Sequence, residues 1–405
     1  MTRKLSSHTA AGTLLLGGLL AAVLFLSVAC GRSSSAQSAP GDTLRLKYAT
    51  LLTIVRHRDY TEVRVADPWH KDRTLATYLL VSDRDIPSDR DIPSNGSKST
   101  SRSVTDQHLP QGVVVRVPLR RAAVFASPHC QLMEYLGAAD RMAGVTDRQY
   151  IVIPDVRRRL SDGRLRDFGS SMSPDVEQII DAGCDALLLS PFEGSSGHGA
   201  LAKTGIPIVE LADYMEPAPL ARAEWMKFYG MLFGCERRAD SLFAVVEHNY
   251  LALKRKAAAM PRGRSILTER KTGSTWYTPG GRSTIATIIR DANGSYAFSD
   301  DRHAGSLPLT AEQIIDKAGQ SDVWAFKVEG NELLDRERLL DEYFGYRELK
   351  AFSTGNIYEC RSSLVPYFEE IAFRPDYLLR EMLLLLHPDK MKGKLRYYER
   401  LMHNS

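Results

Sequence analysis

The chain has few cysteines and no closely spaced pair of them. Five of its 405 residues are cysteine, and no two form a Cys-x-x-Cys arrangement. Outside the N-terminal segment, the thiols at positions 130, 184, 235 and 360 are far apart in sequence, which excludes the usual zinc-binding and redox motifs. Cys184 and Cys235 lie in apolar-periodic stretches, so we expect them to be buried. A disulfide between distant cysteines stays open in an oxidising compartment.

Clustered histidines, catalytic motifs and a concentrated charge are also lacking. The ten histidines are scattered without a His-x-His or His-x-x-x-His pair, so a bare zinc or manganese site is not expected. The chain has no Gly-x-Ser-x-Gly elbow, no Gly-x-x-x-x-Gly-Lys loop and no His-Glu-x-x-His motif. Its net charge is +4 with the arginines spread along the chain, which differs from the clustered basic stripe of nucleic-acid-binding proteins.

What is present begins with an N-terminal segment typical of secretion. A positive region at residues 3–4 precedes a nearly continuous apolar run over residues 10–28, the pattern of a signal peptide. Leu-Ser-Val-Ala-Cys at 26–30 resembles the lipobox of bacterial lipoproteins, although Ser27 stands where that pattern prefers leucine. The resemblance implies that Cys30 is acylated and anchors the protein to a membrane, on the periplasmic side of the cell envelope. An ordinary cleaved signal or a transmembrane anchor is the alternative.

Composition then divides the chain. Residues 31–43 are small and polar and predict a tether. Residues 44–118 alternate apolar and polar side chains at period two and predict a small β-rich region. A tandem hexapeptide at 82–87 and 88–93 interrupts this region and predicts an exposed loop.

Beyond this region, strands alternate with helices on both sides of a helical middle. Strand-like segments at 122–127, 186–190 and 207–211, and again at 265–270 and 322–327, alternate with helical periodicity. This alternation predicts parallel α/β layers, with functional groups at the carboxyl ends of the strands. We therefore expect a first lobe, a helical brace and a second lobe with C-terminal helices, at residues 119–217, 218–260 and 261–405. A helix of about twenty residues from Glu236 would span ~30 Å and brace two lobes.

One pentapeptide occurs once in each predicted lobe. Glu-Gln-Ile-Ile-Asp stands at 177–181 and again at 312–316, each at a predicted helix start. Ser173 is expected to cap the first helix, with a proline at the first helical position. Thr310 and Gln313 match a capping box for the second helix. The two glutamates would then lie near the first turn, where a carboxylate complements the helix dipole, and this role alone would account for them.

The order of the longer motifs resembles a known family. VPLRRAAVFASPHCQLMEYLGAADRMAGVTD, FGSSMSPDVEQIIDAGCDALLLSP and KTGIPIVEL resemble the first lobe of ABC-transporter substrate-binding proteins of the siderophore, haem and vitamin-B12 type. MKFYGMLFGCERRADSLFAVVEHNYLAL is similar to their interlobe helix, and WYTPGGRSTIATIIRDANG, LTAEQIIDKAGQSDVWAF and GNIYECRSSLVPYFEEIAFRPDYLLREMLLLLHPD resemble the second lobe and closing helices. The resemblance covers residues 112–390 and implies a class III periplasmic binding protein fold: two three-layer α/β lobes joined by a long helix.

The resemblance also implies partners. In that family each lobe presents a surface glutamate that docks onto arginines of the membrane permease, and Glu177 and Glu312 match these positions. The implied partners are an ABC permease with its ATPase, and the protein itself is expected to be a monomer without a cofactor, apart from a transported metal chelate. Residues 44–118 lie outside the resemblance to the better-known receptors and are either a brace packed on the first lobe or a docking platform for another envelope protein.

Candidate ligand contacts follow the predicted strands. Aromatic faces with a few polar groups suit a bulky, partly planar chelate. The Thr-Pro-Gly-Gly-Arg-Ser-Thr turn is expected to aim backbone N–H groups at an anionic group. His129 either ligates iron or cobalt axially or is a capping or cleft-lining histidine. The full set of expected contacts is Ser127, His129, Phe192, Glu193, Tyr214, Trp276, Tyr277, Gly280, Gly281, Arg282, Tyr367 and Phe368.

Three functional interpretations remain. The first is a lipid-anchored receptor that captures an iron chelate, haem or a corrinoid and delivers it to an ABC importer. The second is an enzyme acting on such a chelate, a hydrolase or metal-insertion enzyme, with Glu193, His198 and His129 as acid–base groups. The third is an envelope interaction subunit that kept the fold and lost the ligand.

Overall fold

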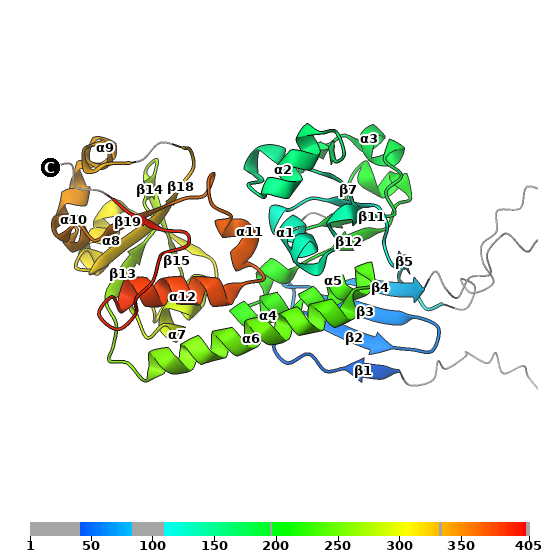
Figure 1. Ribbon diagram of the computed structural model, residues 1–405, viewed down its shortest axis with the longest axis horizontal. Helices are drawn as coiled ribbons and strands as arrows, with labels where there is room; N and C mark the ends of the chain where they lie inside the picture. Colours follow the sequence, from blue (N-terminus) through cyan, green and yellow to red (C-terminus); the bar gives the residue numbers. More distant parts are fainter. Residues whose placement is uncertain (1–40, 83–108, 195–196, 332–333, 402–405) are drawn as a thin grey trace, which may run out of the picture. The chain divides into compact units, whose positions relative to one another are not determined.

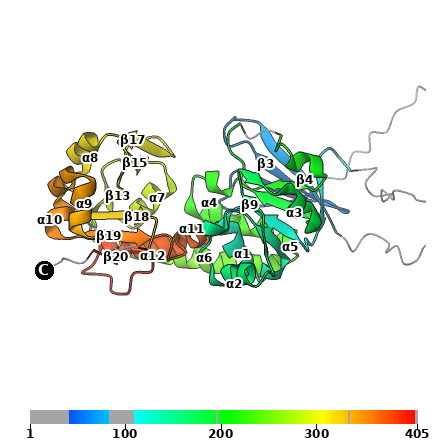
Figure 2. The same ribbon diagram turned by 90° about the horizontal axis from the view of Figure 1, so that it is seen from above.

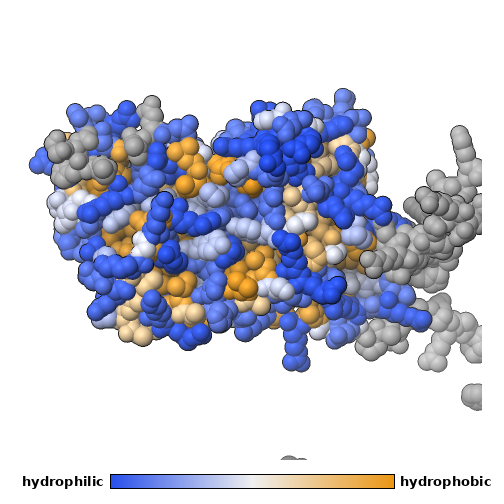
Figure 3. Space-filling view, in the orientation of Figure 1, coloured by the Kyte–Doolittle hydropathy of each residue, from blue (hydrophilic) through white to orange (hydrophobic). Residues whose placement is uncertain are grey.

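The computed structural model describes residues 41–82, 109–194, 197–331 and 334–401. The signal segment with Cys30 lies outside the described residues, as does the tandem hexapeptide after Ser82. Among the described residues, no helix combines the length and the apolar composition that a membrane span requires. The face seen in Figure 3 is mostly hydrophilic, with apolar residues in separate small groups.

The N-terminal region is a five-stranded sheet, as its alternating pattern predicts. Neighbouring strands are antiparallel except for the last pair, which is parallel. The first strand begins at Asp42, so the expectation of a tether through residue 43 is wrong at its last two positions. In sheet order the strands are β1 (Asp42–Leu44), β2 (Leu52–Arg56), β3 (Thr61–Ala66), β4 (Thr74–Ser82) and β5 (Val113–Val117).

This sheet packs on the helices that follow the first lobe. These are α4 (Pro219–Glu224), α5 (Met226–Phe233) and α6 (Glu236–Ala258). The ring of Tyr78 lies 6.1 Å from that of Phe228, and Tyr48 lies 6.1 Å from Phe243. The Tyr78 hydroxyl also accepts a 2.7 Å hydrogen bond from the backbone N–H of Glu210 in the first lobe. The β-rich region is therefore a bracing layer that shares its core with the interlobe helices.

The first lobe has a parallel sheet whose strands are buried. The strand order is β12-β11-β6-β7-β8. All side chains of β6, β7 and β11 are buried, because helices cover this sheet (Figure 1). The strands are β6 (Ala122–Val124), β7 (Met142–Val145), β8 (Arg166–Asp167), β11 (Ala186–Leu189) and β12 (Ile208–Glu210), and the helices are α1 (Ser127–Leu136), α2 (Pro154–Ser161) and α3 (Val176–Asp181). A hairpin of β9 (Gly169–Ser170) and β10 (Ser173–Pro174) leads into α3.

The second lobe repeats this plan with an added antiparallel sheet. Its main sheet has the order β16-β13-β18-β19-β20, and Figure 2 shows β13, β18, β19 and β20 side by side. The main-sheet strands are β13 (Ser265–Thr268), β16 (Ser295–Tyr296), β18 (Val323–Val328), β19 (Ile357–Arg361) and β20 (Glu399–Arg400). The added sheet contains β14 (Lys271–Thr272), β15 (Thr275–Pro279) and β17 (Ser306–Leu309). The helices are α7 (Thr284–Asp291), α8 (Ala311–Ala318), α9 (Arg336–Glu342), α10 (Lys350–Thr354), α11 (Tyr367–Ile371) and α12 (Pro375–Leu386).

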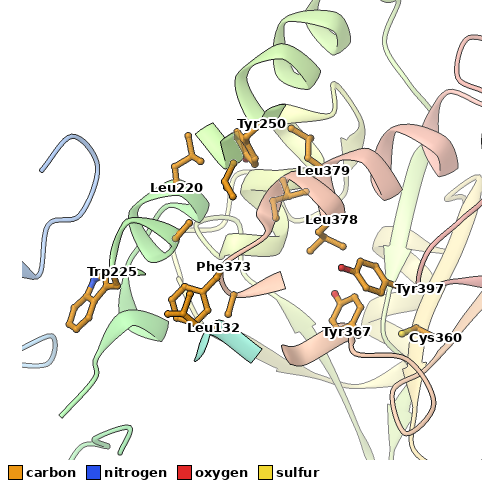
Figure 4. Packing of buried hydrophobic residues seen from close by; sticks show 14 of the residues in the cluster. Leu132, Leu220, Trp225, Tyr250, Cys360, Tyr367, Phe373, Leu378, Leu379 and Tyr397 are labelled. Atoms are coloured by element: carbon orange, nitrogen blue, oxygen red, sulfur yellow. The ribbon is translucent and has the colours of Figure 1, made fainter. Parts of the chain in front are cut away.

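Helix α6 confirms the predicted brace, since it runs for 23 residues from Glu236. It contacts α12, whose Leu379 lies near Tyr250 of α6 in Figure 4. Helix α11 of the second lobe also contacts α1 of the first, where the Tyr135 hydroxyl donates a 3.0 Å hydrogen bond to Glu370.

The four described cysteines are free thiols, so none of them forms the disulfide that the sequence left open. Cys130, Cys184 and Cys360 are buried, and Cys235 is half-buried. Burial raises the pKa of the Cys184 thiol to about 11, which makes it a poor nucleophile at neutral pH.

Asp322 ties together β13 and β18, two neighbouring strands of the second lobe's main sheet. Its carboxylate accepts hydrogen bonds from the Ser265 backbone N–H and hydroxyl, at 2.9 and 2.8 Å, and lies 2.6 Å from Lys350 Nζ. Partial burial alone would raise the Asp322 pKa, but these donors lower it to about 2.

Because folding lowers the Asp322 pKa, the ionised carboxylate stabilises the folded state. This contribution to the unfolding free energy is complete above the unfolded pKa of 3.8 and is lost as pH falls toward 2. We expect Asp322→Asn to lower the unfolding free energy by about 1–2 kcal/mol at pH 7, after allowance for partial exposure. The difference from the unsubstituted protein should shrink below pH 4 in urea titrations. The exposed Asp300→Asn is the matched control; an equal loss at pH 7 and at about pH 2.5 would contradict the assignment.

Candidate functional site

The two copies of the pentapeptide start helices in the same way. Glu177 and Glu312 are each the second residue of their helix, α3 and α8, and both are exposed. The capping box predicted for α8 is confirmed: the Thr310 hydroxyl accepts from the Gln313 N–H, and the Gln313 side chain accepts from the Thr310 N–H. The prediction that Ser173 caps α3 is wrong. Asp175 does so, because Ser173 and the following proline are held in the hairpin strand β10.

A pocket lies within the second lobe. It has a volume of about 740 Å³ and opens at the carboxyl ends of β13 and β18, beside the start of α7. Two exposed aromatic side chains line it, Tyr277 at 50% exposure and Phe368 at 47%. Most of the other lining groups are polar. They are Glu269, Arg270, Thr272, Ser283, Thr284, Ser306, Lys327, Glu329 and Ser362.

The two positively charged side chains of this pocket, Arg270 and Lys327, each form an ion pair with a glutamate. Lys327 Nζ forms an ion pair with Glu269 and lies 5.5 Å from the centre of the Tyr367 ring. Burial alone would lower the Lys327 pKa, but Glu269 holds it above its usual value, so the ammonium stays charged. Arg270 is paired with Glu342 in the same way.

Glu269 has an uncommon backbone conformation for a side-chain-bearing residue, with φ of 64°. Its backbone N–H donates to Ala325 O at 3.1 Å, and its carbonyl accepts from Trp324 Nε1 at 2.7 Å. Strained residues that are over-determined in this way concentrate at binding sites, so Glu269 points to the same pocket.

A second pocket of about 550 Å³ lies within the first lobe. It also opens at strand ends, beside Phe125 after β6 and Ser190 after β11. Its walls are more apolar than those of the first pocket. They include Met172, Pro174, Val176, Leu189, Phe192 and Leu201, with His198 as the titratable group. His198 Nε2 lies 3.2 Å from Glu210, whose pKa is raised by burial.

The two pockets occupy equivalent places in their lobes. Residues 171–174 line the first-lobe pocket and lead into α3 with Glu177. Residues 304–306 line the second-lobe pocket and lead, through β17, into α8 with Glu312. Each pentapeptide therefore begins the helix that follows a pocket-lining segment, directly in the first lobe and after β17 in the second.

Three of the expected ligand contacts are buried. Trp276 has 0% exposure because its ring packs 6.0 Å from Trp324 and 5.6 Å from Tyr346, and Tyr367 is 2% exposed. His129 is 2% exposed, with Nε2 3.0 Å from Asp213. These side chains are buried in the protein interior and line neither pocket, so the expectation that they face a ligand is wrong.

The His129 pair belongs to a buried charge cluster. Asp213 also accepts a 3.0 Å hydrogen bond from Arg222 Nε. Burial alone would raise the Asp213 pKa, but His129 and Arg222 together hold it below its usual value. In the described part of the chain no three His, Cys, Asp or Glu side chains are grouped to hold a metal ion. Of the two roles considered for His129, its burial and the contact of Nε2 with Asp213 argue against axial ligation.

The double-glycine turn was expected to direct backbone N–H groups at an anionic ligand group, but these groups form hydrogen bonds within the protein. Gly280 N donates to Gly305 O at 2.8 Å, and Arg282 N donates to His303 O at 3.0 Å. A Cβ on Gly280 would stand 2.4 Å from His303 O, so glycine is required for this close approach. The turn anchors the neighbouring loop, and Gly280, Gly281 and Arg282 do not line the pocket.

The remaining expected contacts lie in the first lobe. Phe192 lines its pocket, and Glu193 is exposed beside it. The Tyr214 hydroxyl donates a 2.6 Å hydrogen bond to Pro191 O, which joins two loops at the strand ends. Ser127 begins α1 and is half-buried.

Sequence analysis missed most of the polar groups of the second-lobe pocket. Glu269, Arg270 and Lys327 are the charged residues at the ends of the strand-like segments 265–270 and 322–327. The available signal is a charged residue at the carboxyl end of an apolar strand-like segment.

Comparison with known proteins gives the class. The family model described as periplasmic binding protein matches residues 123–364. The lipoprotein MJ0878 of Methanocaldococcus jannaschii, described as uncharacterized, is 28% identical over 295 residues, covering 70% of this chain and 69% of that protein. A possible iron-binding protein of Staphylococcus epidermidis has a similar structure, with a TM-score of 0.52, 18% identity, and coverage of 66% of this chain and 98% of that one. A periplasmic heme binding protein of Pseudomonas aeruginosa has a TM-score of 0.54, 14% identity, and coverage of 71% and 99%.

These findings define a solute-binding protein with the class III fold of two α/β lobes joined by a helix. Since the family model matches more than half of the chain, the protein belongs to the periplasmic binding protein family. Members of this family are binding proteins rather than enzymes. The enzyme interpretation is therefore set aside.

Proposed function

We propose that this protein captures a metal chelate, an iron siderophore, haem or a corrinoid, and delivers it to an ABC importer. The observation that carries the proposal is the pair of pockets at equivalent strand ends, one in each lobe. A chelate that is too large for one pocket would be held by both. Lipid attachment at Cys30 would keep the receptor at the cell envelope beside its permease, and the lipoprotein MJ0878 supports this part of the proposal.

The pocket walls support a chelate with hydrogen-bonding groups at its edge. The second-lobe pocket offers the hydroxyls of Thr272, Tyr277 and Ser306, and its two cations are matched by two carboxylates. A ligand with amide or hydroxamate groups fits this balanced polar wall, and the rings of Tyr277 and Phe368 provide flat apolar contact. Corrinoids and hydroxamate siderophores have such edges, so we favour them over haem.

The test is binding to the protein from Gly31 onward, which contains the compact unit that begins at Gly41. Cyanocobalamin, ferrioxamine B and haemin are titrated by equilibrium dialysis. We expect one of the first two to bind with micromolar or tighter affinity, typical of specific capture. Failure of all three to bind would contradict the proposal and favour a ligand-free envelope subunit.

The two pocket aromatics supply a site-specific prediction. Tyr277→Ala and Phe368→Ala should each weaken binding of that chelate about tenfold, because each removes an aromatic contact worth about 1–2 kcal/mol. Tyr150→Ala is the matched control, since Tyr150 is also an exposed aromatic but lines neither pocket. Equal affinity of all three variants would place the ligand elsewhere.

A further inference from the structure

Lys327 is the one charged residue of a strand that is otherwise apolar. Strand β18 reads Val-Trp-Ala-Phe-Lys-Val, and its other five side chains are buried. The Lys327 side chain is 20% exposed and lines the second-lobe pocket near the carboxyl end of the strand. A cation on a pocket wall attracts an anion more strongly than a cation in open solvent does, because less water screens it. The groups around Lys327 therefore decide which ligand it can bind.

Glu269 occupies the place that the carboxylate of a ligand would take. Its carboxylate forms the ion pair with Lys327, and its side chain is 23% exposed on the same pocket wall. The backbone of Glu269 is held in its positive-φ conformation from both sides, by the hydrogen bonds to Ala325 O and from Trp324 Nε1. The pocket thus carries its own fixed counter-ion for Lys327.

Stability alone does not account for this ion pair. Removing two opposite charges from water is costly, and apolar side chains of similar volume often stabilise a protein at least as well. The left-handed backbone of Glu269 adds a further cost. Such costs are typical of binding sites, where they position a side chain, and the same pocket wall carries the exposed rings of Tyr277 and Phe368.

The other cation of the pocket is neutralised as well. Arg270 is paired with Glu342, and Glu329 adds an exposed carboxylate to the pocket lining. The ligand carboxylate would therefore compete with a glutamate at either cation. An uncharged amide or hydroxamate oxygen meets no such competition, because the ammonium of Lys327 has three N–H donors and can bind it while Glu269 stays in place.

We infer that Glu269 is a specificity-determining residue, which neutralises Lys327 and makes the pocket select chelates with an uncharged polar edge over chelates with free carboxylates. This inference rests on the proposed function and narrows the class of chelate. The selectivity comes from a repulsive element, because a ligand carboxylate beside Glu269 would meet a like charge and lose its hydration. An amide at the same place would meet neither penalty in full.

Matched ligand pairs test this selectivity on the unsubstituted protein. Cyanocobalamin is compared with its monocarboxylic acids, each of which has one side-chain amide replaced by a carboxylate. N-acetyl ferrioxamine B is compared with N-succinyl ferrioxamine B, which ends in a carboxylate. Within the pair that binds, we expect equilibrium dialysis to show at least about tenfold tighter binding of the uncharged member than of the most weakly bound acid. Equal or tighter binding of every acid would overturn the inference.

Glu269→Gln keeps the shape of the side chain and removes its charge. We expect this variant to move the affinity ratio about tenfold toward the acid, because the ligand carboxylate can then pair with Lys327. The shift should disappear when Lys327→Gln is added to Glu269→Gln, since it depends on the ammonium. The matched control is Glu329→Gln, which changes the charge of the pocket lining equally without removing the partner of Lys327. Its shift should be several times smaller, because solvent screens the exposed carboxylate.

Folding of each variant is checked by thermal unfolding followed by circular dichroism, and the ligand pairs decide the question even if Glu269→Gln does not fold. A ratio that Glu269→Gln leaves unchanged would overturn the assignment to Glu269. An equal shift in Glu329→Gln, or a shift that persists in the double variant, would do the same. Failure of the proposed function is distinguishable, because the unsubstituted protein would then bind neither member of either pair, which would overturn both proposals.

Discussion

Chelate uptake is expected to fall at least about a hundredfold when Glu177 and Glu312 are both replaced by arginine, while chelate affinity stays within about twofold. Both carboxylates are exposed at the second residue of a helix and lie outside the pocket linings. If the two glutamates dock onto permease arginines, as the family resemblance implies, reversal would set like charges against these arginines in both lobes, and each such contact costs several kcal/mol. Each single reversal should have a smaller effect, because one docking point remains.

The control separates docking from helix stability. Glu236 and Glu337 are also exposed glutamates in the first turn of a helix, α6 and α9, but they lie outside the repeated motif. Their joint replacement by arginine makes the same change in net charge and in helix-dipole interactions. If this control lost uptake as severely as the docking variant, or if the docking variant transported normally, Glu177 and Glu312 would have no special part in delivery.

The largest stability effect is expected at Glu216. This buried carboxylate accepts hydrogen bonds from the backbone N–H groups of Thr50 and Leu51, at 3.0 and 2.9 Å, and from Trp225 Nε1 at 2.9 Å. Glu216→Ala would leave these donors buried without a partner, at about 1–3 kcal/mol for each unsatisfied group. We expect the unfolding free energy to fall by about 3–5 kcal/mol in urea titrations followed by circular dichroism.

Two further variants define this effect. Glu216→Gln keeps one carbonyl acceptor and should lose about half as much, because part of the hydrogen bonding is restored. The exposed Glu236→Ala should change stability by less than about 0.5 kcal/mol, as ordinary surface substitutions do. Equal stability of Glu216→Ala and Glu236→Ala would show that the N-terminal segment is not held through this carboxylate.

The neighbouring Glu224 repeats the arrangement. It accepts from the N–H groups of Lys47, Tyr48 and Ala49 at 2.9, 2.7 and 2.9 Å. Five consecutive backbone N–H groups of the segment between β1 and β2 are thus satisfied by two carboxylates of the interlobe region, on a stretch that forms no sheet ladder. This anchoring explains why the β-rich region is part of the brace although it lies outside the matched family segment.

The chain's own pattern determined the elements and their order. Strict apolar runs such as residues 186–190 predicted buried strands, and helical spacing after Glu236 predicted the long brace, because both signals depend only on near neighbours. The capping box at Thr310 was equally local, and the structure contains it. The exposed position of the two glutamates followed from the same helix starts.

Only the tertiary structure decided which side chains reach solvent. Trp276 and Tyr277 are adjacent, and the sequence predicts both as ligand contacts. Trp276 is buried between Trp324 and Tyr346, whereas Tyr277 lines a pocket. Alternation in a strand sends neighbours to opposite faces, but it does not say which face another layer covers. Asp175, and not Ser173, caps α3. Ser173 is held in β10 by its pairing with β9, so the helix begins only after Asp175. Lys327 and Glu269 form an ion pair although they are far apart in sequence. Such long-range pairs leave no local pattern that a sequence could reveal.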